Sequence, residues 1–574
     1  MKAKFRSLLK SPVFWILFIT LANLFIYLDL LRLDPLLAFD DHLILDPLIE
    51  LVSLKDYIHA FIAGRIVDIQ PIRDFSLLFD LLLKGHISFW SFHLTNVLIW
   101  ISTVIVFYQI AKETVGESET LLCATILLSA HPVVAISVSW IAARKHLLSV
   151  FFIGCATLLT IYCKKRPGPL SKLKSIWVIV IPCLYLLAVF SHPIGIFWPI
   201  WAVVFLWEDG RKNLSIRQII YLIASMLLVM IGCIKLNYDY YSGRYFMYYA
   251  VEKLSSDFDI SSALLAIGRY TFNIFLPGSV SVKYYPGTVQ NFIGLVLLPL
   301  VLWATVKKSG LRMTFIWGLM IAFPLLTVIG RQKNVFVSDT YLLIPLIGLL
   351  ILSVSMLHRI GFQFVQVSLI RRTSIIASVC LIFGFFVVQS RLIAISFQSE
   401  RLLWDRAYAV ERTPSVVAQQ ITLSIESKQY SKAFELAQEL KEWSPSHPLL
   451  PRLLSKSVYY FDRWSIIEKT NYLESQPMND PWYFYYLAGL YAGMGDYSRA
   501  YRLLSPMTSY SFRYEEEAAT VAAELTYFCV KSIHQQCGKI SKSFEAAING
   551  KATPWRQETF LKRLKELDVE VDKL

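Results

Sequence analysis

Residues 89–111 are FWSFHLTNVLIWISTVIVFYQIA, an apolar run long enough to cross a membrane. A spanning helix needs about 20 largely apolar residues. Such runs recur and predict eleven spanning helices, at 12–31, 89–111, 119–138, 147–163, 175–191, 193–207, 217–236, 291–306, 313–330, 340–357 and 374–397. We therefore expect an all-α fold in which a polytopic helical bundle occupies residues 1–397.

Composition favours the same class of protein. Of 574 residues, 55% are hydrophobic and 17% are charged, and the mean hydropathy is +0.50. These values are typical of polytopic membrane proteins and exclude a water-soluble enzyme. The net charge of +14 would suggest nucleic-acid binding in a soluble protein, but the basic residues lie in short loops between apolar runs. That distribution follows the positive-inside pattern, so no nucleic-acid partner is expected.

The loops predict an orientation. The basic start of the chain is followed by a long apolar run without a small-residue cleavage site, which indicates a retained anchor with a cytoplasmic N-terminus. The first loop, 32–88, and everything after about residue 398 then lie on the outer side. We expect a bacterial-type inner membrane with a periplasmic C-terminal domain, or the endoplasmic reticulum with these surfaces in its lumen. If residues 263–287 formed a further crossing, every later basic loop would lie on the opposite side of the membrane. We therefore interpret these residues as a re-entrant or interfacial segment.

Residues 398–574 are charged and amphipathic and predict a separate helical domain. The window 484–504 has the spacing of a tetratricopeptide repeat, and a partial second copy lies at 430–445. We expect about three to five stacked helix pairs whose concave groove suits a peptide; an ordinary amphipathic helical domain is the alternative. The sequence leaves open whether Cys529 and Cys537 form a disulfide, which would require a turn between them.

Several fragments occur in the order found in one family of membrane enzymes. They are Phe39-Asp40-Asp41-His42, Phe92-His93-Leu94-Thr95-Asn96, His131-Pro132, Trp140-Ile141-Ala142-Ala143-Arg144-Lys145, Ser191 with Ile194-Gly195, and Tyr341 with Pro345. Together with the repeats, they resemble the transmembrane and tetratricopeptide-repeat O-mannosyltransferases of the GT-C glycosyltransferase superfamily. The resemblance covers nearly the whole chain.

The resemblance implies an activity. Enzymes of this family take a sugar, typically mannose, from a polyprenyl-phosphate carrier and move it to a protein hydroxyl outside the cytoplasm. The expected partners are therefore a lipid-linked sugar donor and a protein or peptide acceptor held by the repeat domain. Which sugar and which acceptor are used is not specified by the sequence.

The chain also departs from the family pattern. Val134 and Ile136 replace a second His and a Glu, and Gln70 replaces the Arg of an Arg-Pro pair. His192-Pro193 replaces Lys-Glu, and Thr340 replaces an Arg. Each change removes a polar group that would contact donor or acceptor. Either nearby groups such as Arg73 substitute, or the site has degenerated.

Candidate catalytic residues follow from the chemistry of transfer. A protein hydroxyl is a weak nucleophile, and a carboxylate within hydrogen-bond reach can accept its proton, so Asp40 is the candidate base. Asp41 and His42 could orient Asp40 or bind sugar hydroxyls. Direct displacement of a lipid phosphate would invert the anomeric centre. A divalent metal is possible beside Asp-Asp-His, but the sequence contains no complete ligand set.

The leaving phosphate needs positive charge or amide donors. Arg144 and Lys145, in an outer turn, are candidates for that task, and Arg269 is a second. His93 and His131 complete the candidate binding residues.

Structural interpretations compete with each assignment. The aspartates could cap a helix, and Arg144 with Lys145 could anchor the chain at the lipid headgroups. His93 could join two helices by a hydrogen bond, and His131 could support the proline break.

Two classes of function fit the sequence. The first is the membrane glycosyltransferase. The second is a non-catalytic scaffold that keeps the fold and assembles envelope proteins through its repeats, and the missing polar groups favour it. A transporter is disfavoured because neither half of the chain repeats the other and intramembrane charge is sparse.

Overall fold

The structure is a computed structural model. It describes residues 12–32, 41–49, 53–62, 69–84, 89–165, 171–196, 198–199, 201–202, 216–242, 260–280, 289–297, 339–359, 369–476, 480–504, 527 and 531. All regular secondary structure in these ranges is helical, in agreement with the all-α prediction. The chain divides into two compact units, Met1–Glu411 and Arg412–Leu574. The division falls beyond the expected boundary at 397 because α19 (Glu400–Val410) packs on the helix before it.

The first unit is a bundle of long helices with shorter ones at one end. Its other elements are α2 (Pro12–Ile26), α3 (Leu28–Arg32), α4 (Asp41–Ile49), α5 (Leu54–Ile62), α6 (Pro71–Lys84), α7 (Phe89–Val115), α8 (Glu119–Ser129), α9 (Pro132–Ser139), α10 (Arg144–Lys165), α11 (Ser171–Ser191), η1 (Pro193–Gly195), α13 (Ile216–Ser242), α15 (Ile260–Phe275), η3 (Pro277–Ser279), η4 (Asp339–Leu342), α17 (Leu343–Arg359) and α18 (Leu369–Ser396).

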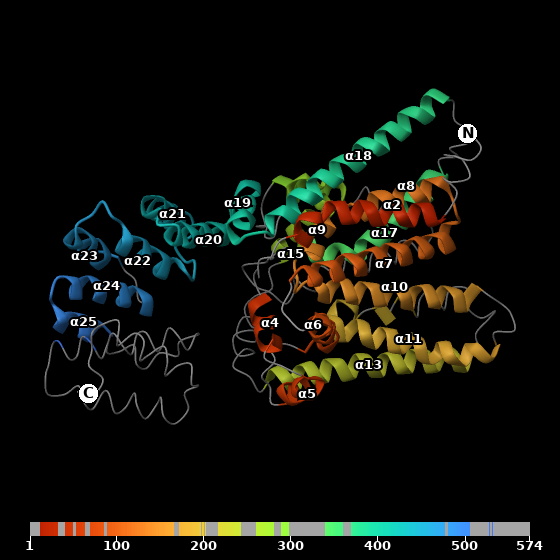
Figure 1. The fold of residues 1–574 in the computed structure, drawn as a ribbon, viewed down its shortest axis with the longest axis horizontal. Coiled ribbons are helices and arrows are strands. Elements are labelled where there is room, and N and C mark those ends of the chain that lie inside the picture. Colours follow the sequence, from red (N-terminus) through yellow and green to blue (C-terminus); the bar gives the residue numbers. More distant parts are fainter. Residues whose placement is uncertain are drawn as a thin grey trace. The chain divides into compact units, whose positions relative to one another are not determined.

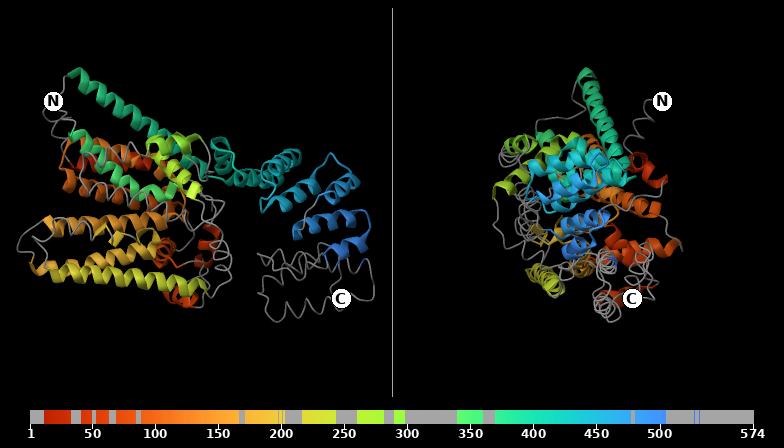
Figure 2. Two further views of the ribbon diagram at one scale, coloured as in Figure 1. Left: turned by 180° about the vertical axis from the view of Figure 1, so that it is seen from behind. Right: turned by 90° about the vertical axis from the view of Figure 1, so that its left-hand side faces the viewer.

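The long helices form a layered bundle around α7. Helices α7, α10, α11 and α13 lie side by side in that order, and α2, α8 and α17 pack against α7 from the other side (Figure 1). The short helices α4, α5 and α6 gather at one end of the bundle, which we call the site end (Figure 2). Helix α10 begins and α11 ends at the site end, and α6 packs on both helices there. Segments far apart in the sequence therefore meet there.

Several described helices fit a membrane protein. Three are long and apolar enough to span a bilayer, Trp90–Val115, Arg144–Cys163 and Thr373–Ser396. A fourth span results if α8 and α9 count as one helix bent by 48°. The bend falls at His131-Pro132, because proline cannot donate the backbone hydrogen bond that would continue α8. The predicted span 313–330 lies outside the described residues, and the other predicted spans stay predictions.

Helix α18 leaves much of its apolar surface uncovered. Only 6% of its spanning window is buried. Leu381 is 74% exposed and Val388 is 54% exposed. Such a surface suits contact with lipid, where apolar side chains face hydrocarbon instead of water.

The second unit consists of helix pairs. Its described helices are α20 (Pro414–Glu426), α21 (Tyr430–Trp443), α22 (Leu450–Tyr460), α23 (Ile466–Glu474), α24 (Pro481–Gly493) and α25 (Tyr497–Leu504). Helix α20 packs on α21, and α24 packs on α25. The α24–α25 turn places Gly495 at φ +82°, a left-handed conformation that glycine adopts without steric cost. The assignment of these pairs to tetratricopeptide repeats stays a prediction.

Candidate functional site

Asp41 connects the first polar loop to the start of α10. It is the first residue of α4 and is only 1% exposed. Its Oδ1 accepts a hydrogen bond of 2.8 Å from the backbone N–H of Ala142, in the turn between α9 and α10. The Asp41 carboxylate is therefore buried against this turn instead of facing bulk solvent. Asp40 and the side chain of His42 lie outside the described residues.

Arg144, which follows this turn, is completely buried and bound on all sides by the protein. Its Nε donates to Asn96 Oδ1 at 2.8 Å, and its Nη1 donates to the carbonyl and hydroxyl oxygens of Ser76 at 3.0 and 3.1 Å. Its Nη2 donates to the Phe92 carbonyl at 2.8 Å and lies 2.7 Å from Asp80 Oδ2. Each guanidinium nitrogen thus has a partner inside the protein, and none is left over for a phosphate in this conformation.

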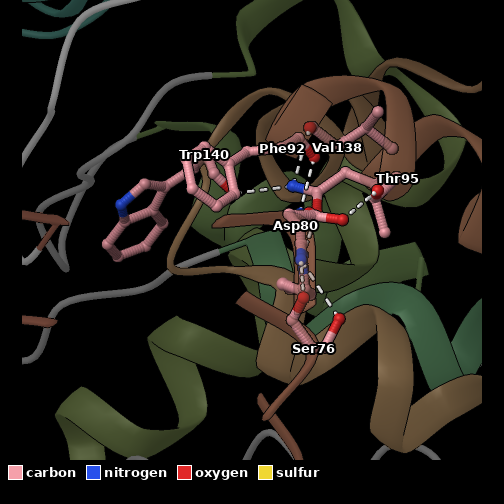
Figure 3. A network of polar contacts seen from close by, with 8 residues as sticks. Ser76, Asp80, Phe92, Thr95, Val138 and Trp140 are labelled. Atoms are coloured by element: carbon pink, nitrogen blue, oxygen red, sulfur yellow. Dashed lines mark hydrogen bonds and ion pairs between the residues drawn. The ribbon is translucent and has the colours of Figure 1, made fainter. Parts of the chain in front are cut away.

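The partners of Arg144 are themselves held in place (Figure 3). Asp80 Oδ1 accepts a hydrogen bond of 2.9 Å from the Thr95 hydroxyl. The Asn96 amide donates to the carbonyls of Val138 and Trp140, each at 3.2 Å, while the Trp140 indole points away from the network. The network therefore joins α6, α7 and the α9–α10 turn, and positions that turn.

His93 lies on α7 one turn before Asn96. It is 1% exposed, and within the described part of the chain neither of its ring nitrogens has a hydrogen-bond partner. The expected helix-to-helix hydrogen bond of His93 is therefore not made among those residues.

A cluster of three aromatic rings lies beside the turn. His146, in the first turn of α10, packs its ring 4.2 Å from that of His192 and 5.2 Å from that of Tyr341, measured between centroids. The rings of His192 and Tyr341 are 6.3 Å apart. His146 is buried, whereas His192 and Tyr341 are partly exposed. We call these three residues the His-Tyr cluster.

Close packing of η1 on α10 fixes His192. The Ser149 hydroxyl donates to the His192 carbonyl at 3.2 Å. A Cβ at Gly195 would lie 2.8 Å from Ile153 Cδ1, so only glycine allows this approach without a shift. The sequence indicates this element only through the fragment 191–195, in which His192 replaces a lysine of the family pattern.

Arg73 also lies in an internal network. It is 1% exposed, and its Nη2 lies 2.6 Å from Asp74 Oδ1. Its Nη1 donates to Gln70 Oε1 at 3.0 Å, and Asp74 accepts a hydrogen bond of 3.0 Å from the Tyr57 hydroxyl. Asp74, which is paired with Arg73, therefore ties the start of α6 to α5.

Arg269 and His131 both hold α15 in place. Arg269 Nη1 donates to Gln290 Oε1 at 2.7 Å, and its Nη2 lies 3.1 Å from Glu411 Oε2. His131 caps α9 by accepting the Val133 N–H at Nδ1, and its Nε2 lies 3.0 Å from the Ile274 carbonyl oxygen. His131 therefore joins the proline break to α15 and acts there as a structural support.

Of the predicted basic pair, Lys145 differs from Arg144 in being partly exposed. Among the described residues, no group of three or more His, Cys, Asp and Glu side chains is arranged to hold a metal ion. Cys529 and Cys537 lie outside the described residues.

Comparison with family models, curated proteins and solved structures finds no match to this chain. Any assignment of function therefore depends on the chemistry of the residues themselves. The contacts described above define the candidate site as Asp41, the turn 140–145 and the His-Tyr cluster.

Proposed function

We propose that this chain is an inverting membrane glycosyltransferase that moves a sugar from a polyprenyl-phosphate donor to a protein hydroxyl. One observation carries the proposal: fragments from four distant parts of the sequence meet at the site end. Asp41 bonds to Ala142, and His146 packs on His192 and Tyr341. Asp41, Ala142 and Tyr341 belong to the fragments on which the resemblance to GT-C O-mannosyltransferases rests, and His146 and His192 lie next to such fragment residues.

The chemistry assigns the two ends of the reaction to different groups. Asp40, next to the buried Asp41, is the candidate base that accepts the proton of the attacking hydroxyl. The bond between the sugar C1 and the phosphate oxygen breaks, and its electron pair stays on the phosphate. Because Arg144 is engaged with Asp80, the phosphate is left to Lys145 and to donors nearby.

The wider architecture belongs to the same proposal. Eleven spans would embed the bundle, and the pairs of the second unit would form a tetratricopeptide solenoid that holds the acceptor peptide. With a cytoplasmic N-terminus, catalysis and the solenoid lie on the periplasmic side of a bacterial inner membrane, or in the lumen of the endoplasmic reticulum.

A scaffold without catalysis is the second candidate, and the arginines favour it. Arg73, Arg144 and Arg269 are each at most 1% exposed and ion-paired within the protein. These three arginines serve the packing of the bundle, as expected of a bundle retained to present the second unit to envelope proteins.

Transfer by the purified full-length chain distinguishes the two candidates. The chain is supplied with polyprenyl-phosphate mannose and a serine-containing peptide, and is compared with Asp40→Asn and with Asp405→Asn. Asp405 is a matched control because its carboxylate is 50% exposed and pairs with Arg401 on α19. We expect transfer by the parent and the control and its loss in Asp40→Asn. A parent that transfers no sugar and binds no donor, yet captures an envelope protein through residues 412–574, would instead establish the scaffold.

A further inference from the structure

Helix α6 has the reverse of the pattern expected for a helix that faces water. The charged residues of α6 whose surroundings the structure describes are Arg73, Asp74 and Asp80, and all three are buried. They are ion-paired inside the protein, Arg73 with Asp74 and Asp80 with Arg144. A surface helix of a soluble domain instead turns its charges toward water and its apolar side chains toward the core.

The exposed side chains of α6 are all large and apolar. Among the described residues of this helix, the exposed ones are Phe75, Phe79 and Leu82, at 37%, 61% and 55%. Their spacing of four and three residues places them on one face of the helix. We call these three residues the α6 stripe. An apolar stripe opposite buried charges fits hydrocarbon as its surroundings instead of water.

The contacts of α6 show that it runs across the bundle. It packs on α7, α10 and α11, which lie side by side in that order (Figure 1). A helix that contacts three neighbouring helices in a row must cross them instead of running parallel to them. In a bilayer spanned by the long helices, α6 therefore lies along the plane of the membrane, as interfacial helices do.

Arg144 gives the depth at which α6 lies. Its Nη1 donates to the carbonyl and hydroxyl oxygens of Ser76, near the middle of α6. Arg144 is also the first residue of the candidate span Arg144–Cys163, which has 20 residues. At a rise of 1.5 Å per residue this span is about 30 Å long, which is the thickness of the hydrocarbon core. Its first residue, and α6 with it, therefore lies where the acyl chains meet the headgroups.

The α6 stripe is close to a surface that already fits lipid. The Asp80 carboxylate, next to Phe79 in the chain, accepts the Thr95 hydroxyl in the second turn of α7. In these first turns of α7, Trp90 and Leu98 are 39% and 49% exposed. Helix α7 is long and apolar enough to span a bilayer, and tryptophan is enriched at the level of the headgroups. The two exposed apolar surfaces therefore lie at the same end of the same span.

We propose that α6 is an interfacial helix whose stripe is buried among the acyl chains of the bilayer leaflet at the site end. The inference goes beyond the proposed function, because it needs only a bilayer around the bundle and holds for the transferase and the scaffold alike. It also sets the depth of the candidate site. The ion pair of Asp80 and Arg144 lies at the level of the lipid headgroups, where the phosphate of a prenyl-phosphate lipid lies.

Helix α5 provides an internal control for this proposal. Its residues Lys55, Asp56 and His59 are exposed, which is the pattern of a helix in water. Ile58, on the same helix, is 47% exposed and stands alone among polar neighbours. A probe in the acyl chains should therefore reach α6 and miss α5.

Photolabelling from the lipid tests the inference. The purified full-length chain is placed in phosphatidylcholine nanodiscs that include a phosphatidylcholine with a diazirine near the carboxyl end of one acyl chain. Labelled peptides are mapped by mass spectrometry after irradiation. Labelling is expected on residues 71–84 and on the exposed face of α18, and not on α5. Labelling of α18 without labelling of 71–84 would overturn the inference, and so would equal labelling of α5 and α6.

A charged substitution tests the role of the stripe itself. Phe79→Asp is expected to lose most of the labelling of 71–84 and to keep that of α18, because a carboxylate is costly among acyl chains. The matched control Ile58→Asp is expected to be labelled as the parent is. Unchanged labelling of 71–84 in Phe79→Asp would overturn the inference. If thermal unfolding shows that this variant is not folded, the labelling of the parent decides.

Two further arms separate other occupants of the stripe. Labelling of 71–84 that unlabelled polyprenyl phosphate blocks, while labelling of α18 stays, would overturn the bilayer assignment in favour of the prenyl chain of a donor. Labelling of 71–84 that is lost when two chains share one nanodisc would overturn it in favour of a second copy of this chain. All these measurements are made without a sugar donor, so their failure leaves the test of sugar transfer unaffected.

Discussion

The substitution Asp80→Asn tests whether the Arg144 network stabilises the fold. Asp80 Oδ2 lies 2.7 Å from Arg144 Nη2, and the two side chains are 6% and 0% exposed. The amide keeps an oxygen that can accept the Thr95 hydroxyl, so the main change is the loss of negative charge. Removing one partner of a buried ion pair leaves the other charge uncompensated and costs about 3–5 kcal/mol. We expect the free energy of unfolding to fall by that amount.

Reversible unfolding of the purified chain in mixed micelles, followed by tryptophan fluorescence, measures the change. The matched control is Glu117→Gln, because Glu117 forms an ion pair of 2.7 Å with Lys112 while the two side chains are 50% and 34% exposed. Exposed pairs contribute about 0–1 kcal/mol, so the control should unfold nearly as the parent does.

The buried network also predicts a separation of stability from binding. If Arg144 serves the fold, Asp80→Asn should retain the parent's affinity for the polyprenyl-phosphate sugar below its unfolding temperature. A variant as stable as Glu117→Gln would refute the structural assignment. A stable variant with altered phosphate affinity would indicate that Arg144 binds the phosphate of the sugar donor.

Two further predictions concern packing and capping. A Cβ at Gly294 would overlap the Gly268 carbonyl oxygen, so Gly294→Ala should lower the free energy of unfolding by about 1–3 kcal/mol or more. The control Gly384→Ala places its new Cβ where no atom lies within 4 Å and should leave the free energy of unfolding unchanged. Thermal unfolding measures both variants. Hydrogen bonds from the N–H and hydroxyl of Ser465 lower the pKa of Glu468 below its ordinary 4.5. A lowered pKa means that this cap of α23 stabilises fully above that ordinary value and is lost as the pH falls through the lowered one. An NMR titration should find the Glu468 pKa raised part of the way toward its ordinary value in Ser465→Ala, because alanine keeps the backbone N–H and loses only the hydroxyl. An equal pKa in both proteins would contradict a role of the Ser465 hydroxyl in this cap.

The helical nature of the chain could be predicted because it depends on local pattern. Apolar runs such as 89–111 and 374–397 exceed the length of a spanning helix, and the structure has helices at both. The bend between α8 and α9 could be predicted as well, since Pro132 cannot continue a helix. These features need no knowledge of distant residues.

The environment of Arg144 could not be predicted from local pattern. The sequence shows a basic residue after a short turn, but its partners Asn96 and Ser76 lie 48 and 68 residues away. Whether such a guanidinium faces a ligand or the protein depends on how α6 and α7 pack, which periodicity does not specify. Burial of Asp41 against Ala142 depends on the same packing.

His146 and His192 could not be assigned to a site for a different reason. A single histidine in an apolar helix is more often a core residue than a ligand, so His146 carried no local signal. A usable signal did exist in the recurrence of His-Pro at 131, 192 and 447, because in each dipeptide the histidine Nδ1 accepts the backbone N–H two residues later. Only the structure relates one of these dipeptides to Tyr341.

Photolabelling shows whether the site end holds the donor. The probe is a prenyl-phosphate sugar that carries a reactive group on its first isoprene unit. Labelled peptides of the purified chain are mapped by mass spectrometry, with the matching prenyl alcohol as competitor. We predict specific labelling of the segments 140–146 and 192–195, blocked by unlabelled polyprenyl phosphate and not by the alcohol. Labelling confined to the apolar face of α18 and blocked equally by the alcohol would contradict a donor site at this end of the bundle.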